Sequence, residues 1–213
     1  MRITSHTVGP FQENCYLVVD ETTQRAVLVD PGAEGERILR AVTASGATLD
    51  AIWLTHAHVD HVGGIAAVRR VHDVPIYLHP ADRLLYDRAA MQAAHYGMSF
   101  DEPPPPDREL AEGDVMRVGI AEFLVLHTPG HAPGHCVFDG NSVVLGGDLL
   151  FAGSVGRTDL PLCDPRAMSD SLDRVAALAP GLVVHPGHGP STTIGREVET
   201  NPFLNGVARV VRR

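Results

Sequence analysis

Lysine is absent from this chain of 213 residues, and all 17 basic residues are arginine. The absence excludes mechanisms that need a lysine amine, such as Schiff-base catalysis and the lysine-containing phosphate loop. The 26 acidic residues give a formal net charge of −9, and no cluster of arginines exceeds two adjacent residues. Because nucleic acids are bound by a basic face, we expect no nucleic-acid partner.

Long apolar runs and paired cysteines are also missing. No apolar run reaches the ~18 residues that span a membrane, and the first ten residues lack the apolar segment of a signal peptide. We therefore expect no membrane partner and a cytoplasmic location. The three cysteines, Cys15, Cys136 and Cys163, form no Cys-x-x-Cys pair. We expect them to be reduced and mostly buried, rather than joined in disulfides or bound to zinc.

Short strands and helices alternate along the chain, separated by turn residues. An antiparallel meander is predicted over residues 2–8, 14–20 and 25–30. Helices are predicted at 34–44, 65–71, 81–95 and 164–178. Further strands are predicted at 51–54, 75–78, 121–126, 136–139, 142–145 and 182–184. The second half repeats the rhythm of the first, which favours an α/β fold of two sheets packed face to face with helices outside.

We expect a single domain over residues 1–213, a usual length for one hydrophobic core. Residues 101–107 include four consecutive prolines and are predicted to form an extended surface loop. A domain boundary at this loop is the alternative.

Histidine is abundant where aromatic residues are few: the chain has 12 histidines, against 6 Phe, 4 Tyr and 1 Trp. His56, His58, Asp60 and His61 fall within six residues, directly after the predicted strand at 51–54. Crowded imidazoles repel one another when protonated, whereas a divalent cation satisfies them in the neutral form. The cluster therefore predicts a metal site rather than histidines that only pack.

Three further residues each lie in a glycine-containing loop after a predicted strand: His131, Asp148 and His188. If these loops meet at one edge of the sheets, the seven side chains exceed the ligands of one four- or five-coordinate ion, so we expect two divalent ions. The first set is predicted to be His56, His58 and His131. The second set is predicted to be Asp60, His61 and His188, with Asp148 bridging. Nitrogen and oxygen ligands suit zinc, iron or manganese, with zinc the leading candidate.

The other histidines are interpreted structurally. His127 and His135 flank the cluster in its own loops and are candidates to orient the ligands through hydrogen bonds, with packing alone as the alternative. His185 is expected to pack at a strand end. The remaining four are expected to lie at the surface or beside a hydrogen-bond partner: His6, His72, His79 and His95.

The order His-x-His-x-Asp-His, followed by the loops of His131, Asp148 and His188, resembles the metallo-β-lactamase superfamily. Three segments are similar to its glyoxalase II branch, the hydroxyacylglutathione hydrolases, and especially to the short bacterial members: 128–135 (TPGHAPGH), 156–161 (GRTDLP) and 186–190 (PGHGP). The resemblance implies an αββα sandwich with a dinuclear site at one edge. It also implies a hydrolase that cleaves a thioester, S-lactoylglutathione or a related S-acylglutathione, through a metal-bridging hydroxide that Asp60 orients.

The loop after the bridging aspartate departs from this family. The lysine and tyrosine with which the family contacts glutathione align with Arg157 and Asp159. A guanidinium can bind a carboxylate through two hydrogen bonds, so Arg157 is expected to bind the glycine carboxylate of glutathione.

Two other functions remain open. The Gly-Arg-Thr-Asp sequence of the same loop also occurs in the persulfide dioxygenase branch of the superfamily, which uses a single iron. This mononuclear iron dioxygenase is the main alternative, although segment 187–190 resembles the hydrolases more closely. A structural or regulatory metal-binding module is the third candidate, which the open coordination of the predicted site disfavours. The sequence leaves the acyl group and the oligomeric state undecided.

Overall fold

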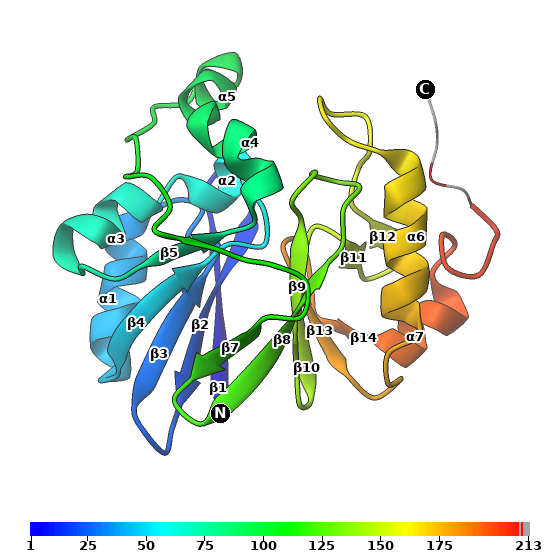
Figure 1. Cartoon of the computed structure of the whole chain (residues 1–213), viewed down its shortest axis with the longest axis horizontal. Helices are drawn as coiled ribbons and strands as arrows, with labels where there is room; N and C mark the ends of the chain where they lie inside the picture. The colour runs from blue at the N-terminus through cyan, green and yellow to red at the C-terminus, as the bar shows by residue number, and fades with distance from the viewer. Residues whose placement is uncertain (209, 211–213) are drawn as a thin grey trace.

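The computed structural model describes residues 1–208 and 210, in which two six-stranded sheets lie face to face with helices along both outer surfaces (Figure 1). The strands of the first sheet follow chain order: β1 (Arg2–Val8), β2 (Glu13–Asp20), β3 (Arg25–Val29), β4 (Thr48–Trp53), β5 (Ile76–Leu78) and β6 (Arg108–Glu109). The second sheet has the order β14 (Thr192–Thr193), β13 (Val183–Pro186), β10 (Val143–Gly147), β9 (Cys136–Gly140), β8 (Ala121–His127) and β7 (Val115–Val118). A hairpin stands apart: β11 (Leu150–Phe151) and β12 (Ser154–Val155).

Both sheets are mixed. β1, β2 and β3 pair antiparallel, as the predicted meander requires, and β3 to β6 pair parallel. The helices are α1 (Gly35–Ser45), α2 (Val59–Val62), α3 (Ile65–Val71), α4 (Arg83–Asp87), α5 (Ala89–His95), α6 (Pro165–Ala176) and α7 (Ile194–Thr200). The predicted α/β fold of two facing sheets with helices outside is confirmed.

Three apolar layers follow from the two-residue period of the strands. In β3, Val27 and Val29 face the second sheet, whereas Ala26 and Leu28 face the outer helices. Trp53, at the end of β4, packs between the sheets. α1 closes the outer face of the first sheet, and α6 closes that of the second. This packed scaffold fixes the positions of the loops that leave the strand ends.

The predicted helix at 81–95 is wrong as one continuous element. A 3-10 turn, η1 (Pro80–Asp82), leads into α4 and α5, which meet at Arg88. Arg88 has a φ of −103° and a ψ of 11°, which interrupts the helix. Gln92 bridges the interruption, because its Nε2 donates a 2.8 Å hydrogen bond to the Leu85 carbonyl oxygen. Strong helix formers lie on both sides of Arg88, Leu84 and Leu85 before it and an alanine-rich segment after it, so composition does not reveal this break.

Several short elements have no counterpart among the predicted ones: β6, β7, β11, β12, β14, α2 and α7. Each has seven residues or fewer, too short for a periodic pattern to identify. Residues 101–106 form neither helix nor strand, as predicted for the proline-rich loop. Within residues 1–208 and 210, no helix has the length and apolar character needed to cross a membrane.

Candidate metal centre

The predicted ligands come from loops at the ends of strands in both sheets. His56 and His58 follow β4, and the four-residue helix α2 begins at Val59, so it carries Asp60 and His61. The other three lie after β8, β10 and β13, respectively: His131, Asp148 and His188. The structure thus brings side chains that are up to 132 residues apart in the chain to one end of the sandwich.

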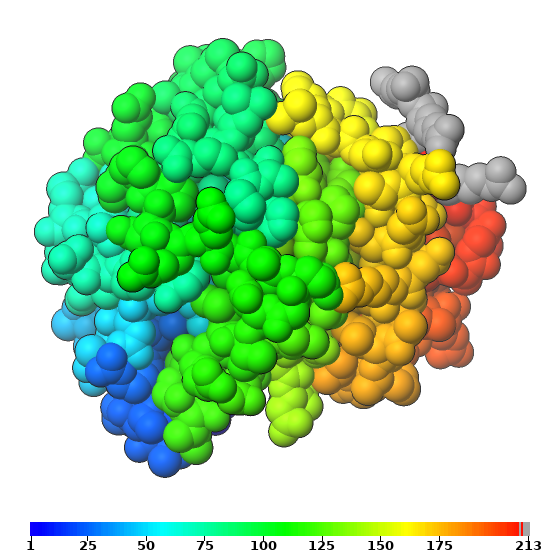
Figure 2. Space-filling model, viewed as in Figure 1, coloured from blue at the N-terminus to red at the C-terminus, as the bar shows by residue number. Residues whose placement is uncertain are grey.

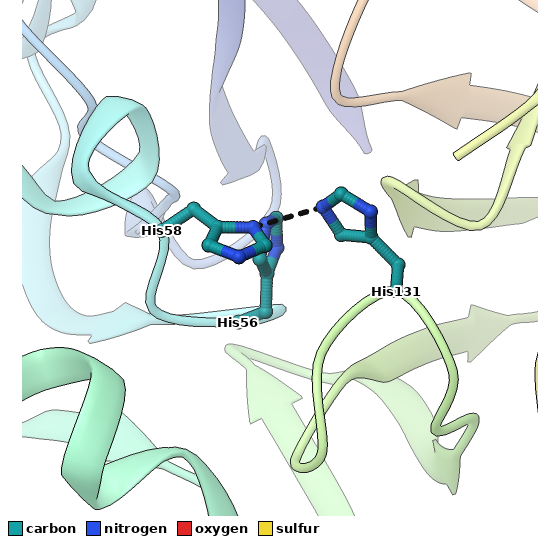
Figure 3. A group of neighbouring side chains, drawn as sticks. All are labelled: His56, His58 and His131. Carbon is teal, nitrogen blue, oxygen red and sulfur yellow. Dashed lines mark hydrogen bonds between the residues drawn. The ribbon is translucent and has the colours of Figure 1, made fainter. Parts of the chain in front are cut away.

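The first predicted set is assembled. One nitrogen from each of His56, His58 and His131 lies within 4.8 Å of the others. His58 Nδ1 and His131 Nε2 are 2.9 Å apart, and Figure 3 shows the two rings pointing toward each other, with His56 beside them. All three side chains are buried.

The second predicted set is assembled beside it. Ligand atoms of Asp60, His61 and His188 also lie within 4.8 Å of one another. Asp148 stands between the sets: its Oδ2 is 3.4 Å from His131 Nε2 and 3.5 Å from His188 Nε2. Its Oδ1 is 3.5 Å from His61 Nε2. Asp148 therefore faces both sets, as a bridging carboxylate would.

Unpaired polar atoms show that these residues fit metal ions. Nε2 of His56, Nε2 of His61 and Oδ1 of Asp148 are buried and have no hydrogen-bond partner among the described residues. Buried polar atoms are nearly always paired, because an unpaired one loses its bonds to water without replacement. Divalent cations bound by these nitrogen and oxygen atoms would satisfy them.

Electrostatics also favours cations at this position. Burial holds the pKa of His56 well below its usual value, and burial together with His131 lowers the pKa of His58 to about 3. Both imidazoles are therefore neutral, the form that binds metal. Burial opposes a charge on His61, yet Asp148 and Asp60 raise its pKa well above the usual value. The two carboxylates that stabilise a proton on His61 would also attract a divalent cation.

Hydrogen bonds outside the cluster fix the direction of two of the ligand rings. His131 Nδ1 lies 2.7 Å from the Arg157 carbonyl oxygen, and His188 Nδ1 lies 3.1 Å from that of Phe11. Carbonyl oxygens only accept, so both Nδ1 atoms carry the proton and both Nε2 atoms are left to bind a cation.

Asp30 contacts the predicted ligands but was not identified from the sequence. Its carboxylate accepts hydrogen bonds from the backbone N–H of Thr55 at 2.7 Å and the Thr55 hydroxyl at 2.6 Å, and it lies 3.0 Å from His61 Nδ1. Asp30 follows β3 directly, beside the end of its parallel neighbour β4. The strand-end pattern that identified the ligands could have found it.

Asp82 was missed as well. This buried carboxylate accepts hydrogen bonds from the backbone N–H of Ala57, at 2.9 Å, and from that of Gly134. It thereby joins the loop between His56 and His58 to the loop that follows His131. Burial raises the pKa of Asp82 to about 6, against the two hydrogen bonds that favour the carboxylate.

The two flanking histidines differ in position. His135 is buried, and its Nε2 accepts a 3.0 Å hydrogen bond from the backbone N–H of Asp148, so it supports the bridging residue. His127 instead stacks on His79 with ring centres 4.0 Å apart and contacts the Pro133 carbonyl oxygen.

A cavity of about 680 Å³ opens above the cluster. Its floor includes five of the predicted ligands: His58, Asp60, His131, Asp148 and His188. Arg157 lines the cavity too, but its Nε and Nη2 are held by Asp159 at 2.7 and 2.9 Å. Helices α4 and α5 form one wall and residues 154–162 another; Figure 2 shows these regions, green and yellow, next to each other at the top of the molecule.

Comparison with known proteins agrees with the fold. The model of the metallo-beta-lactamase superfamily matches residues 8–188, which include all seven predicted ligands. The hydroxyacylglutathione hydrolase GloC of Haemophilus influenzae is 35% identical over 96% of this chain and 99% of its own.

Two solved structures are also similar. TTHA1623 in a di-iron-bound form is 49% identical, with a TM-score of 0.88 over 94% of this chain and 100% of that chain. The B3 metallo-beta-lactamase BLEG-1 is 36% identical, with a TM-score of 0.90 over 96% of this chain and 100% of that chain. The His/Asp cluster and the di-iron neighbour together support binding of divalent metals. With most of its length matched by the family model and its fold shared with these relatives, the chain belongs to the metallo-β-lactamase superfamily.

Proposed function

We propose that this protein is a dinuclear-metal hydrolase that cleaves a thioester, S-lactoylglutathione or a related S-acylglutathione. The observation that carries the proposal is the pair of ligand sets that share Asp148 on the floor of an open cavity. The likeness to GloC supports glutathione thioesters as the substrate class.

Two divalent ions at this centre, with zinc the leading candidate, would polarise the acyl carbonyl and lower the pKa of a water toward ~7. The protein's own contribution centres on Asp60, whose carboxylate lines the cavity and lies 3.3 Å from His188 Nε2. We assign Asp60 to orient the attacking water and to take its proton at Oδ2. Water oxygen adds to the acyl carbon, and the carbon–sulfur bond breaks. The leaving thiolate needs little help from an acid, because a thiol has a pKa of about 8.5.

A cytoplasmic location is part of this proposal. The structure leaves all three cysteines free, with Cys15 and Cys136 buried and Cys163 half-buried. Free thiols are usual in a reducing compartment.

Metal content and activity together test the proposal. We expect the purified protein to hold two metal ions per chain by elemental analysis and to hydrolyse S-lactoylglutathione. A chelator should abolish hydrolysis, and added metal should restore it. One iron per chain, with oxygen consumption and sulfite release from glutathione persulfide, would instead identify the dioxygenase and refute the hydrolase.

Arg157 is proposed to contact the substrate, with a limited effect on binding. Because Asp159 already engages two of its nitrogens and both side chains are exposed, a new ion pair there is worth about 0.2–1 kcal/mol. Arg157→Gln should therefore raise KM for S-lactoylglutathione by about one- to fivefold, with kcat unchanged. A loss of activity beyond about tenfold in steady-state kinetics would show that Arg157 does more than this.

A further inference from the structure

We propose that Arg88 contributes more than Arg157 to binding an anionic group in the cavity, and that the substrates are organic anions whose reacting group is attached to an apolar chain. This inference depends on the proposed function in one respect, that the reacting group is a thioester. It is argued from the charge and polarity of the cavity walls above the predicted metal-binding residues.

Arg88 is the one guanidinium in the cavity lining that no side chain holds, among the residues that the structure describes. Arg157, the other arginine of the lining, is paired with Asp159. Neighbouring Arg83 is paired with Asp87 and lies outside the lining. An anion that reaches Arg88 therefore displaces only water, whereas one that reaches Arg157 competes with a carboxylate.

Arg88 lines this wall at the junction of α4 and α5. Arg88 is the C-cap residue of α4 and the N-cap residue of α5, and its φ and ψ angles lie outside the helical region. Leu85, Arg88 and Gln92 line the cavity and are three and four residues apart, so they share one side of α4 and α5.

Most of the remaining wall is apolar, with Gln92, His95 and Ser154 as its polar members. Phe11, Leu85, Met91, Tyr96, Phe151 and Leu162 line it. Four of these are large side chains left exposed to solvent: Phe11, Met91, Tyr96 and Leu162. The Phe11 and Tyr96 rings meet edge to face, with centres 5.0 Å apart.

The acidic residues of the described lining are Asp60 and Asp148, both assigned to the metal centre. Exposed apolar side chains gathered around a cavity are typical of a site that binds an apolar group. The wall thus suits a ligand in which an alkyl or aryl chain lies next to one anionic group that Arg88 can bind.

Binding of unreactive thioethers to the metal-loaded protein tests the proposal without turnover. By calorimetry, we expect S-hexylglutathione to bind at least about 30-fold more tightly than S-methylglutathione, since each buried methylene favours binding. Arg88→Gln should raise the Kd of S-hexylglutathione about tenfold and leave unchanged that of S-hexyl-N-acetylcysteamine, which carries no charge. Arg88→Lys should recover part of the loss.

Arg83→Gln is the matched control, since it removes an arginine five residues away that lies outside the cavity. It should leave every Kd unchanged. Equal affinity for hexyl and methyl thioethers would overturn the apolar part of the proposal. An unchanged Kd in Arg88→Gln, or equal losses for charged and uncharged ligands, would overturn the role of Arg88. If the binding pattern holds but the protein hydrolyses no thioester, the proposed function fails and this inference stands.

Discussion

Asp148→Ala is expected to lower kcat/KM for S-lactoylglutathione by at least about a thousandfold. Asp148 contacts His61, His131 and His188, and it is the carboxylate that faces both ligand sets. Without it, the two sets lose their shared anion. Metal ions contribute several kcal/mol to such reactions, and each 1.36 kcal/mol is a tenfold change in rate. Elemental analysis should find fewer than two metal ions per chain after dialysis.

A matched control separates this effect from misfolding. Asp173→Ala removes a carboxylate from the exposed face of α6, outside the cavity, and should keep full activity and metal content. Circular dichroism should show that both variants fold. If Asp148→Ala keeps two metal ions and more than a tenth of the wild-type activity, Asp148 does not bridge the two sets.

Asp82→Asn is expected to reduce both stability and metal affinity. The asparagine side chain offers one acceptor oxygen, so one of the two N–H groups now bound to Asp82, that of Ala57 or of Gly134, would face an amide donor. A buried unpaired donor costs about 1–3 kcal/mol in the free energy of unfolding. Since Asp82 joins the two loops that carry the first ligand set, metal affinity should fall about 10- to 100-fold.

Urea unfolding of the metal-free protein and metal titration with a competing chelator measure these two effects. Asp87→Asn, on the exposed surface of α4, is the control and should change neither. Full metal affinity in Asp82→Asn would show that the loops are held in place without this carboxylate.

The effect of Asp82→Asn on stability should also depend on pH, in a direction that follows from the pKa of Asp82. Burial raises the pKa of Asp82 to about 6, above its usual value of 3.8, so between these values the folded state takes up a proton that the unfolded chain does not. The contribution of Asp82 to stability therefore increases as the pH falls through this range. The unfolding free energy of the wild type, measured relative to that of Asp82→Asn, should therefore increase as the pH falls from 7 to 4. A constant difference would contradict the raised pKa.

The clustering of the seven predicted ligands could be predicted from the sequence, because a simple rule links sequence to position. Loops that leave the ends of neighbouring strands meet at one edge of a sheet, and imidazoles spaced as His56, His58 and His61 have few other uses. The same rule extends to Asp30, which follows β3 directly but was not among the predicted ligands.

Other features depend on contacts that no local pattern records. Asp82 contacts Ala57 and Gly134, which lie 25 and 52 residues away in the chain, so its role appears only in three dimensions. The break at Arg88 is similar, since strong helix formers on both sides of it favour a continuous helix. The pairing of Arg157 with Asp159 was also missed, although the two are close in sequence, because the alignment with the family treated them separately.

The proposed function requires that the two ligand sets hold two ions with Asp148 between them. Anomalous diffraction from crystals of the metal-loaded protein would locate these ions. We expect two peaks ~3.5–4 Å apart, one beside His56, His58 and His131 and the other beside Asp60, His61 and His188. A single peak at full metal loading, or two peaks without Asp148 between them, would rule out a dinuclear centre bridged by Asp148.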